Sequence, residues 1–415
     1  MRLKVLVIGS GAREHAAAWK FTKSKRISGL FIAPGNAGTD ELGINIDVDI
    51  MDNDAILNVV KEHNINFVFI GSEMPLANGL ADVLRERNIN CFGPGKEAAQ
   101  LESSKAFSKA FMKRNNIPTA DYKEFSDSTK YTKYINSLDK KVVIKKSGLA
   151  AGKGVLESDN KKEMLDFGLN ALKDDKVVVE EFLEGYEVSI FVISDGKNYS
   201  ILQPCTDHKK AYDGDKGPNT GGMGAITPVP WVDDVLMERI EKESVVPTIN
   251  GLNKDGLNYK GVIYIGLMIG EDGPKVLEYN VRFGDPEAQI IFPTIASDFC
   301  NIMDVISEGT LDTYKIRLTG ESAVSITIAA EGYPGPCLKG FKATVPDIPQ
   351  SNGIIFHAST KLEKGEIITG GGRSFTAVAC GKNTLEACEN AYKVAKQISF
   401  KGSWYRKDIA RKFFK

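Results

Sequence analysis

The chain has 415 residues, 42% of them hydrophobic and 26% charged, a composition typical of a soluble globular protein with two to three domains. Its 53 Lys and Arg residues nearly balance its 54 Asp and Glu residues, and the net charge of −1 excludes a general basic field for nucleic acid. The six cysteines form no CxxC pair and no apolar run could span a bilayer, so we expect a cytoplasmic protein without a zinc site, disulfide framework or membrane partner.

The first hundred residues predict an alternation of strands and helices. Strands are expected at 4–9, 29–33, 66–71 and 90–93, and helices at 13–22, 55–63 and 76–87. Continuous apolar strands separated by helices are typical of a doubly wound parallel sheet, in which ligands bind beyond the carboxyl ends of the strands. We therefore predict an N-terminal α/β domain over residues 1–103.

Two glycine-rich turns of this domain are candidate ligand sites. The first turn, formed by Gly9, Ser10 and Gly11, does not complete the dinucleotide-binding pattern, because Glu14 occupies the position of the last small residue. Free amides at a helix N-terminus still suit a phosphate, so this turn is either a monophosphate or small-ligand site or a purely structural turn. The second turn is formed by Pro34, Gly35, Asn36, Ala37 and Gly38.

A second α+β region is predicted to follow a helix that begins at Lys105, where Ser104 is a suitable cap. Lys145 ends an apolar strand, and Lys153 lies in the small-residue loop 148–154. Glycines let backbone amides approach phosphates and lysines supply positive charge, so these three lysines indicate a nucleotide site. The loop is not a P-loop, because glycine and valine follow Lys153. The strand at 177–183 is expected to present edge amides to an adenine.

The segment from 276 to 287 carries the strongest signal for chemistry. Side chains alternate across a strand, so Glu278, Asn280 and Arg282 share one face, while Leu277, Tyr279, Val281 and Phe283 share the apolar face. A carboxylate and an amide oxygen are the hard ligands that Mg²⁺ takes, and an adjacent guanidinium suits phosphoryl or carboxylate oxygens. A solvated strand face is the alternative, but a turn at 271–274 predicts a hairpin that would hold the row in place.

Several motifs in chain order resemble the phosphoribosylamine–glycine ligase family of ATP-grasp ligases. The resemblance extends over nearly the whole chain, and Arg-Phe-Gly-Asp-Pro-Glu at 282–287 is its most specific element. The other motifs are VIGSGAREHA (7–16), APGNAGT (33–39), FGP (92–94), GLAAGKGV (148–155), EEFL (180–183), DHK (207–209), GPNTGGMG (217–224), FHASTK (356–361) and GGR (371–373). The sequence departs from the family at Lys146-Ser147 and at Ser72, and the first departure leaves contacts near the phosphate loop uncertain.

The resemblance implies three domains and the ligation of glycine to 5-phosphoribosylamine with ATP, giving glycinamide ribonucleotide, ADP and phosphate. The implied domains are an N-terminal domain at 1–103, an ATP-grasp domain at 104–321 with a lid at about 118–190, and a small α+β domain at 322–415 that closes over the others. Mg²⁺ or Mn²⁺ would be held by Glu278 and Asn280, with Arg282 and Lys209 as catalytic residues. ATP would be bound by Lys105, Lys145, Gly152, Lys153, Gly154, Glu180, Glu181, Phe182, Leu183 and Glu187. Glycine and phosphoribosylamine would be bound by the two glycine turns and by Asp207, His208, Thr220, Gly221, Gly222 and Met223.

Three other functions are compatible with parts of the sequence. Another ATP-grasp enzyme, such as a carboxylase subunit, would respond to bicarbonate rather than glycine. An NAD-linked oxidoreductase is opposed by the incomplete glycine pattern, and a non-catalytic regulator would bind ATP without releasing phosphate. We expect small-molecule partners only and a monomer, with a weak dimer as the alternative.

Overall fold

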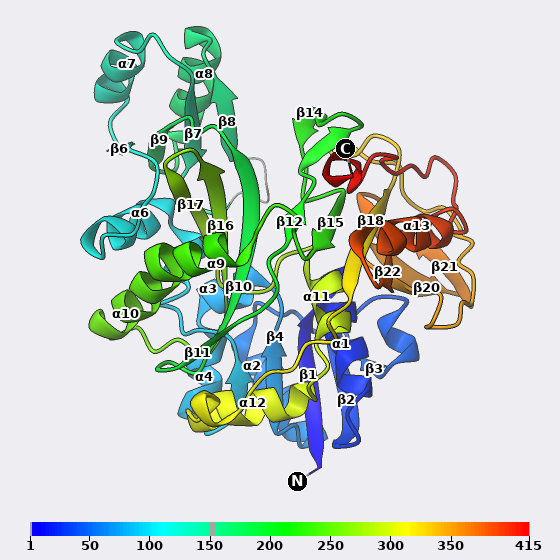
Figure 1. Ribbon diagram of the computed structural model, residues 1–415. Helices are drawn as coiled ribbons and strands as arrows, with labels where there is room; N and C mark the ends of the chain where they lie inside the picture. The colour runs from blue at the N-terminus through cyan, green and yellow to red at the C-terminus, as the bar shows by residue number, and fades with distance from the viewer. Residues whose placement is uncertain (1, 150–153, 415) are drawn as a thin grey trace.

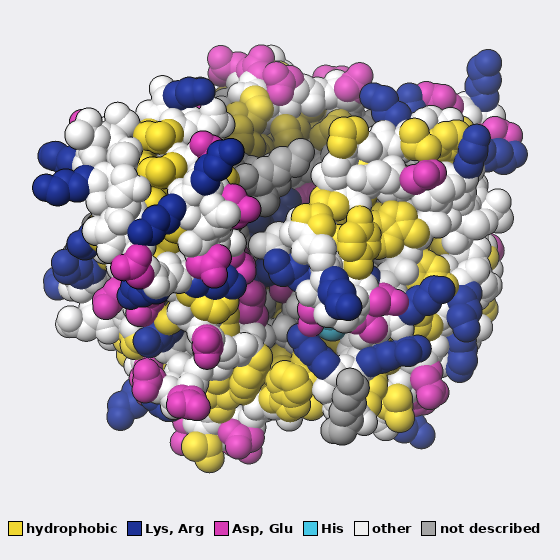
Figure 2. Space-filling model, turned by 90° about the horizontal axis from the view of Figure 1, so that it is seen from above, with side chains coloured by type: hydrophobic (Ala, Val, Ile, Leu, Met, Phe, Trp, Pro, Cys, Tyr) yellow, Lys and Arg dark blue, Asp and Glu magenta, His cyan; other side chains and the backbone are white. Residues whose placement is uncertain are grey.

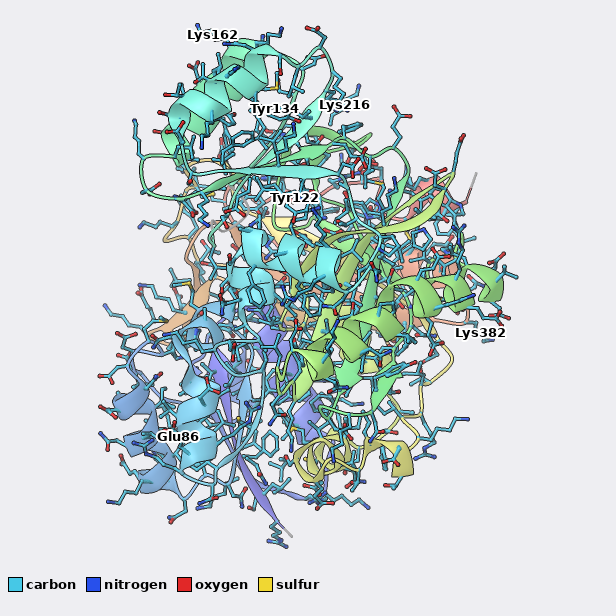
Figure 3. All side chains as sticks on the ribbon, turned by 90° about the vertical axis from the view of Figure 1, so that its left-hand side faces the viewer. Glu86, Tyr122, Tyr134, Lys162, Lys216 and Lys382 are labelled. Carbon is cyan, nitrogen blue, oxygen red and sulfur yellow. The ribbon has the colours of Figure 1, made fainter. Side chains whose placement is uncertain are left out.

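The computed structural model describes residues 2–149 and 154–414, which Figure 1 shows as three regions. The N-terminal region lies at the bottom of this view, a lid rises at the upper left, and the C-terminal region lies at the upper right. Figure 3, turned to the side, places Tyr122, Tyr134 and Lys162 in the raised lid and Glu86 at the opposite end. Among the described residues, no helix is both long and apolar enough to cross a membrane.

The N-terminal region confirms the predicted doubly wound parallel sheet. Its strand order is β3-β2-β1-β4-β5, and every pairing is parallel. The helix expected at 76–87 is interrupted at Gly79, and the two-residue strand β3 was not predicted. The elements are β1 (Leu3–Gly9), α1 (Ala12–Thr22), β2 (Ile27–Pro34), a 3₁₀ turn (Thr39–Glu41), β3 (Ile44–Asn45), α2 (Asn53–His63), β4 (Phe67–Ile70), α3 (Glu73–Asn78), α4 (Leu80–Glu86) and β5 (Asn90–Phe92).

The lid is a four-stranded sheet, ordered β6-β9-β7-β8, with two helices and its own small core. It follows a helix whose N-terminus is capped by Ser104, as predicted, since the Ser104 hydroxyl accepts a hydrogen bond from the Phe107 amide. The elements are α5 (Gln100–Ser103), α6 (Lys105–Arg114), β6 (Tyr122–Phe125), α7 (Ser128–Asn136), β7 (Val142–Lys146), β8 (Val155–Ser158), α8 (Lys161–Ala171) and β9 (Val177–Glu181).

A second four-stranded sheet, ordered β11-β10-β16-β17, forms the floor beneath the lid. Its long antiparallel hairpin β16–β17 confirms the turn expected at 271–274. The elements are β10 (Tyr186–Ser194), β11 (Tyr199–Ile201), α9 (Asp234–Ile240), a π-helical turn (Glu241–Val245), α10 (Val246–Lys254), β16 (Gly261–Gly270), β17 (Gly273–Asn280), α11 (Ala288–Thr294), α12 (Phe299–Glu308) and a 3₁₀ turn (Leu311–Thr313).

The third large sheet joins segments from both sides of the predicted boundary at 321/322. Its order is β12-β15-β18-β22-β19, so two short strands that flank residues 208–223 pair into the C-terminal region. The boundary itself stays a prediction. The elements are β12 (Thr206–Asp207), β13 (Lys210–Tyr212), β14 (Lys216–Asn219), β15 (Gly224–Thr227), β18 (Ser322–Ala329), β19 (Ile354–His357), β20 (Thr360–Glu363), β21 (Glu366–Thr369), β22 (Arg373–Gly381), α13 (Thr384–Ala395) and a 3₁₀ turn (Arg411–Phe413).

Candidate active site

All three regions contribute side chains to one cavity of about 560 Å³. Such a volume lies within the range of roughly 300–1,000 Å³ that small-molecule sites occupy. Figure 2, seen from above, shows the surface hollowed between the lid side and the C-terminal side. The predicted residues that line the cavity are Lys105, Lys145, Gly154, Glu180, Asp207, Lys209, Thr220, Gly221, Glu278, Asn280 and Arg282.

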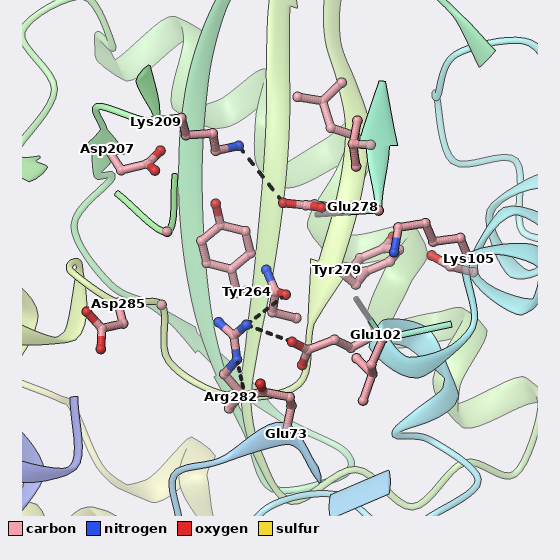
Figure 4. A pocket seen from close by; sticks show the side chains of 18 of the residues that line it. Glu73, Glu102, Lys105, Asp207, Lys209, Tyr264, Glu278, Tyr279, Arg282 and Asp285 are labelled. Carbon is pink, nitrogen blue, oxygen red and sulfur yellow. Dashed lines mark hydrogen bonds and ion pairs between the residues drawn. The ribbon is translucent and has the colours of Figure 1, made fainter. Parts of the chain in front are cut away.

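The polar row on β17 faces this cavity, as the alternation predicted. Glu278, Asn280 and Arg282 line it together, and Figure 4 shows Glu278 near the centre of the group. Tyr279 packs into the core and is 2% exposed, as predicted for the apolar face, although it also lines the cavity. The prediction for Leu277 was wrong, because Leu277 lines the cavity. The pairing of β16 with β17 shifts register at this point, since Gly266 pairs with Glu278 and the next residue pairs with Val276, so Leu277 leaves the apolar face.

Glu278 lies among positive charges. Its carboxylate is 3.9 Å from the Lys209 ammonium. Burial alone would raise the pKa of Glu278, but the positive charges of Lys209, Lys145 and Lys105 outweigh burial and hold the pKa below its usual value. The carboxylate is therefore ionised at neutral pH, which is the state that a metal ligand requires.

Arg282 is fixed by carboxylates that sequence analysis did not connect to it. One guanidinium nitrogen lies 2.7 Å from a Glu102 oxygen and donates a hydrogen bond of 3.2 Å to the Asn280 side-chain oxygen. Glu73 is 3.6 Å from the Arg282 Nε and also 3.6 Å from Arg13. Arg282 thus orients the Asn280 amide so that its oxygen faces the guanidinium, and its own position is set by helix residues from the N-terminal half of the chain (Figure 4).

The lysines form a second group around Glu180. Lys145 lies 3.0 Å from one Glu180 oxygen and Lys109 lies 2.9 Å from the other, while Lys145 also donates a hydrogen bond of 3.1 Å to the Leu277 carbonyl. Burial lowers the pKa of Lys109 to about 8, although Glu180 opposes this shift. Two ammonium groups share one carboxylate, so this corner of the cavity keeps a positive charge suited to phosphate oxygens.

The departure from the family pattern at 146–147 is accommodated without disturbing these lysines. The Lys146 ammonium donates hydrogen bonds of 3.1 Å to the Asp174 carboxylate at the surface. The Ser147 carbonyl accepts a hydrogen bond from the Lys105 amide at 2.9 Å, and the Ser147 hydroxyl accepts one from the Ala106 amide at 3.2 Å. Ser147 thereby fixes the first turn of α6, where Lys105 enters the cavity.

The opposite wall of the cavity carries further acids. Lys209 pairs with Glu187 at 2.5 Å, and Glu187 and Asp207 outweigh burial to raise the pKa of Lys209. Burial is the main cause that raises the pKa of Asp207 to about 6 and that of Glu287 to about 8. Glu187 and Glu278 raise the pKa of Asp207 further, and Asp207 raises that of Glu287. Glu287 accepts a long hydrogen bond of 3.4 Å from the Ser189 hydroxyl.

We expect Glu287→Gln to remove a pH dependence of stability. The folded protein keeps a proton on Glu287 up to about pH 8, whereas the unfolded chain releases it near the usual pKa of 4.5. The stabilisation from this proton is complete below the lower value and is lost as pH rises through the upper one. The melting temperature of the wild type should therefore fall relative to that of Glu287→Gln between about pH 5 and pH 8. Parallel melting curves across this range would contradict the assignment.

The first glycine turn holds a carboxylate of the protein itself. The Gly11 amide donates a hydrogen bond of 2.7 Å to Glu14. A Cβ at Gly9, Gly11 or Gly71 would lie 2.5–2.8 Å from the Glu14 side chain, so these glycines make room for it. The described residues that line the cavity do not include Gly9, Ser10 and Gly11. A ligand role for the turn stays a prediction, and a phosphate there would compete with Glu14 for the Gly11 amide.

The second glycine turn packs between the N-terminal and C-terminal regions. The Asn36 amide group donates hydrogen bonds to the Ser10 carbonyl at 2.8 Å and to the His357 carbonyl at 2.9 Å. His15 accepts a hydrogen bond of 2.9 Å from the His357 amide and lies against Gly38. The described residues that line the cavity do not include Pro34, Gly35, Asn36, Ala37 and Gly38.

The remaining predicted residues of the described ranges are not among those that line the cavity. His208 points to the other side of the chain from Asp207 and Lys209 and accepts a hydrogen bond of 3.3 Å from the Ala410 amide. Glu181 ends β9, where its amide donates to the Asp121 carbonyl at 2.9 Å. Phe182 and Leu183 follow that strand, Gly222 and Met223 are buried beside β15, and Gly152 and Lys153 lie outside the described residues.

Sequence analysis missed several residues that line the cavity. Lys109 lies four residues after Lys105 on α6, a spacing that places both on one helix face and could have revealed it. Arg13, Glu287 and Arg373 stand inside motifs that were noted only as motifs. No local pattern points to Glu73, Glu102, Tyr264 and Tyr333, which also line the cavity.

Comparisons with known proteins find similarity along nearly the whole chain and divide it into three domains. The chain matches family models described as the N domain (residues 3–102), ATP-grasp (A) domain (103–288) and C domain (323–412) of phosphoribosylglycinamide synthetase. It is 42% identical to a phosphoribosylamine–glycine ligase of Agrobacterium fabrum and 40% identical to one of Rhodopirellula baltica, covering 98% of each. A crystal structure of phosphoribosylamine–glycine ligase from Thermotoga maritima superposes with a TM-score of 0.85 at 35% identity, covering 98% of this chain and 100% of that one.

Other relatives are longer or more distant. The chain is 44% identical to the trifunctional purine biosynthetic protein adenosine-3 of Gallus gallus but spans 42% of its length, and it spans 54% of the bifunctional protein purD of Dictyostelium discoideum. It thus spans about half the length of several curated relatives. A biotin carboxylase of Campylobacter jejuni shares the fold, with a TM-score of 0.76 at 15% identity.

The lid, the β16–β17 floor and the lysine-lined cavity between them define the ATP-grasp class of ligases. The particular family within this class follows from the match along the whole chain, because the N, ATP-grasp and C domain models of phosphoribosylglycinamide synthetase follow one another in the sequence. The chain belongs to the phosphoribosylamine–glycine ligase family, as its sequence motifs predicted.

Proposed function

We propose that the protein ligates glycine to 5-phosphoribosylamine at the expense of ATP and forms glycinamide ribonucleotide, ADP and phosphate. The observation that carries this proposal is the position of Glu278 and Asn280, which lie in one cavity between lysines on one side and acids on the other. The family supplies the identity of the substrates, since the matched ligases are named for them. A monomeric state and a cytoplasmic location are parts of the same proposal.

ATP and a divalent metal are the cofactors that the site fits. Glu278 and Asn280 present one carboxylate and one amide oxygen to the cavity, and both are hard ligands. No cluster of three or more metal-binding side chains occurs among the described residues, so the remaining ligands would be phosphate oxygens and water. When bound there, Mg²⁺ or Mn²⁺ would neutralise charge on the phosphates.

The protein's own groups divide the cavity into two halves. Lys105 and Lys145, with the loop that contains Gly152, Lys153 and Gly154, would bind the triphosphate. The backbone of 180–183 would meet the adenine and Glu187 the ribose hydroxyls. Asp207 and Lys209 would then face the second half, where glycine and the amine meet (Figure 4).

The reaction would proceed by two displacements without a covalent enzyme intermediate. A carboxylate oxygen of glycine attacks the γ-phosphorus, the bond to ADP breaks, and glycyl phosphate forms. The amine nitrogen of phosphoribosylamine then attacks the carbonyl carbon, phosphate leaves, and the amine gives up a proton. Neither cysteine nor histidine occurs among the described residues that line the cavity, so positioning and charge neutralisation by lysines and Arg282 would carry the catalysis.

A coupled assay for ADP tests the proposal. We expect release of ADP to require both glycine and phosphoribosylamine, because the first displacement is productive only when the cavity is filled and closed to water. With hydroxylamine added to the complete mixture, glycine hydroxamate should form only when ATP is present. Release of ADP with bicarbonate instead of glycine would indicate a carboxylase-type enzyme. Binding of ATP without any release of ADP would indicate a regulator.

A further inference from the structure

The C-terminal domain reaches the cavity through two side chains, Tyr333 and Arg373. Arg373 begins β22, and its β-sheet partner Ala329 ends β18, four residues before Tyr333. The Ala330 amide also donates a hydrogen bond of 2.8 Å to the Gly372 carbonyl. The two side chains therefore lie at the same end of one sheet, Arg373 on β22 and Tyr333 in the turn that follows β18.

Both side chains hold the backbone of a single residue, Gly221. The Gly221 amide donates a hydrogen bond of 2.9 Å to the Tyr333 hydroxyl. Arg373 donates one of 2.6 Å to the Gly221 carbonyl and a longer one of 3.3 Å to the Gly222 carbonyl. The N–H and the C=O of Gly221 are thus both engaged by the C-terminal domain.

Arg373 also connects the loop that contains Gly221 and Gly222 to Asp285, three residues after Arg282. The same guanidinium nitrogen donates a hydrogen bond of 2.8 Å to the Asp285 carbonyl and lies 3.2 Å from the Asp285 carboxylate. Gly222 packs directly on Pro286, and a Cβ at Gly222 would be 3.5 Å from the Asp207 carboxylate. The loop that contains Gly221 and Gly222 therefore forms one wall of the cavity together with Asp207 and Asp285.

That wall is remote from the nucleotide lysines. In Figure 4, Asp207 and Asp285 lie on one side of Glu278 and Lys105 lies on the other. A contact that sets the position of Gly221 should therefore affect the half of the cavity that does not hold the triphosphate.

We propose that Tyr333 and Arg373 are positioning residues that hold the Gly221 backbone, and through it the wall that binds glycine and phosphoribosylamine. This inference rests on the proposed function for the identity of the two substrates. The hydrogen bonds to Gly221 do not depend on it. The sheet that β12 and β15 share with β18 would then hold the C-terminal domain against the half of the cavity where glycine and the amine meet.

Tyr333→Phe tests the hydroxyl with little change of shape. The KM values for glycine and phosphoribosylamine should rise about fivefold, the effect of losing one neutral hydrogen bond, while the KM for ATP stays within about twofold. Arg373→Lys should raise the same two KM values by about tenfold or more, because a flexible lysine lacks the rigid planar guanidinium that holds one nitrogen against both the Gly221 and Asp285 carbonyls. Gly221→Ala is a third probe, since its Cβ would lie 3.0 Å from the Arg373 guanidinium carbon and would displace that flexible group.

Tyr392→Phe is the matched control in the same domain. Its hydroxyl accepts a hydrogen bond of 2.9 Å from the Ile409 amide and donates one of 3.0 Å to the Arg406 carbonyl, away from the cavity. It should lower the melting temperature as much as Tyr333→Phe or more and leave all KM values unchanged. Unchanged KM values in both Tyr333→Phe and Arg373→Lys, or an equal rise for ATP, would overturn the positioning role.

Hydrogen exchange separates this inference from the proposed function. Peptides that cover 219–224 should exchange faster in Tyr333→Phe than in the wild type, and at the wild-type rate in Tyr392→Phe. If the wild type released no ADP with glycine and phosphoribosylamine, the proposed function would fail while the exchange result still decided the Gly221 contact. Equal exchange in all three proteins would refute the contact itself.

Discussion

Glu278→Gln is expected to lower kcat by a factor of about 10²–10³ while leaving the fold intact. The substitution keeps the shape of the side chain but removes the negative charge that Lys105, Lys145 and Lys209 surround. A neutral amide is a weaker ligand for a divalent cation, so the requirement for Mg²⁺ or Mn²⁺ should shift to higher concentrations. Steady-state kinetics over a metal titration, with melting temperatures measured in parallel, would give both effects.

Glu271→Gln provides the control for this variant. Glu271 is exposed in the turn that joins β16 to β17, on the same hairpin as Glu278 and outside the cavity. It should retain wild-type kcat and metal dependence. Near-normal kcat for Glu278→Gln at ordinary metal concentration would show that the metal assignment is wrong.

Arg282→Met should lose both activity and stability, and a second substitution should restore only the stability. The change leaves Glu102, whose side chain is 6% exposed, without its partner at 2.7 Å, which costs about 3 kcal/mol of unfolding free energy. Removing the negative charge in the double variant Arg282→Met/Glu102→Gln should recover most of that loss. kcat/KM should stay at least about 100-fold below wild type in both, because the guanidinium that bonds Asn280, and that would neutralise phosphoryl charge in the proposed mechanism, is absent.

Chemical denaturation and steady-state kinetics on the two variants measure the separate losses. Glu102→Gln alone serves as the reference that completes the double-mutant cycle. If the double variant regained activity together with stability, Arg282 would have a structural role only.

The polar row of Glu278, Asn280 and Arg282 could be predicted from sequence because it depends on a local rule. Alternation along one strand places Glu278 and Asn280 on the same face whatever surrounds them. Leu277 does not follow this alternation, because the pairing with the partner strand β16 shifts register there. Such a shift cannot be read from the sequence of β17 alone. The lysines Lys105 and Lys145 were found for a similar reason, since each stands at the end of a recognisable helix or strand.

The rest of the site depends on contacts between distant parts of the chain. Glu102 and Arg282 are 180 positions apart in sequence, and no periodicity relates α5 to the end of β17. The first glycine turn shows the limit of motif reasoning, because Glu14 was treated as a defect in a dinucleotide pattern. In the structure that carboxylate packs against Gly9, Gly11 and Gly71 and is the group for which the glycines make room.

The mixed origin of the sheet β12-β15-β18-β22-β19 bears on how the chain can be divided. A fragment that ends at residue 321 would keep β15 but lose its partner β18. The backbone amides and carbonyls of β15 that pair with β18 would then be exposed to solvent at a sheet edge. An exposed edge of this kind promotes association between copies of the fragment. The strand β12, which carries Asp207, would also lose the sheet that holds it. For engineering purposes, the nucleotide-binding and C-terminal portions are therefore inseparable, although the family models delimit them as separate modules.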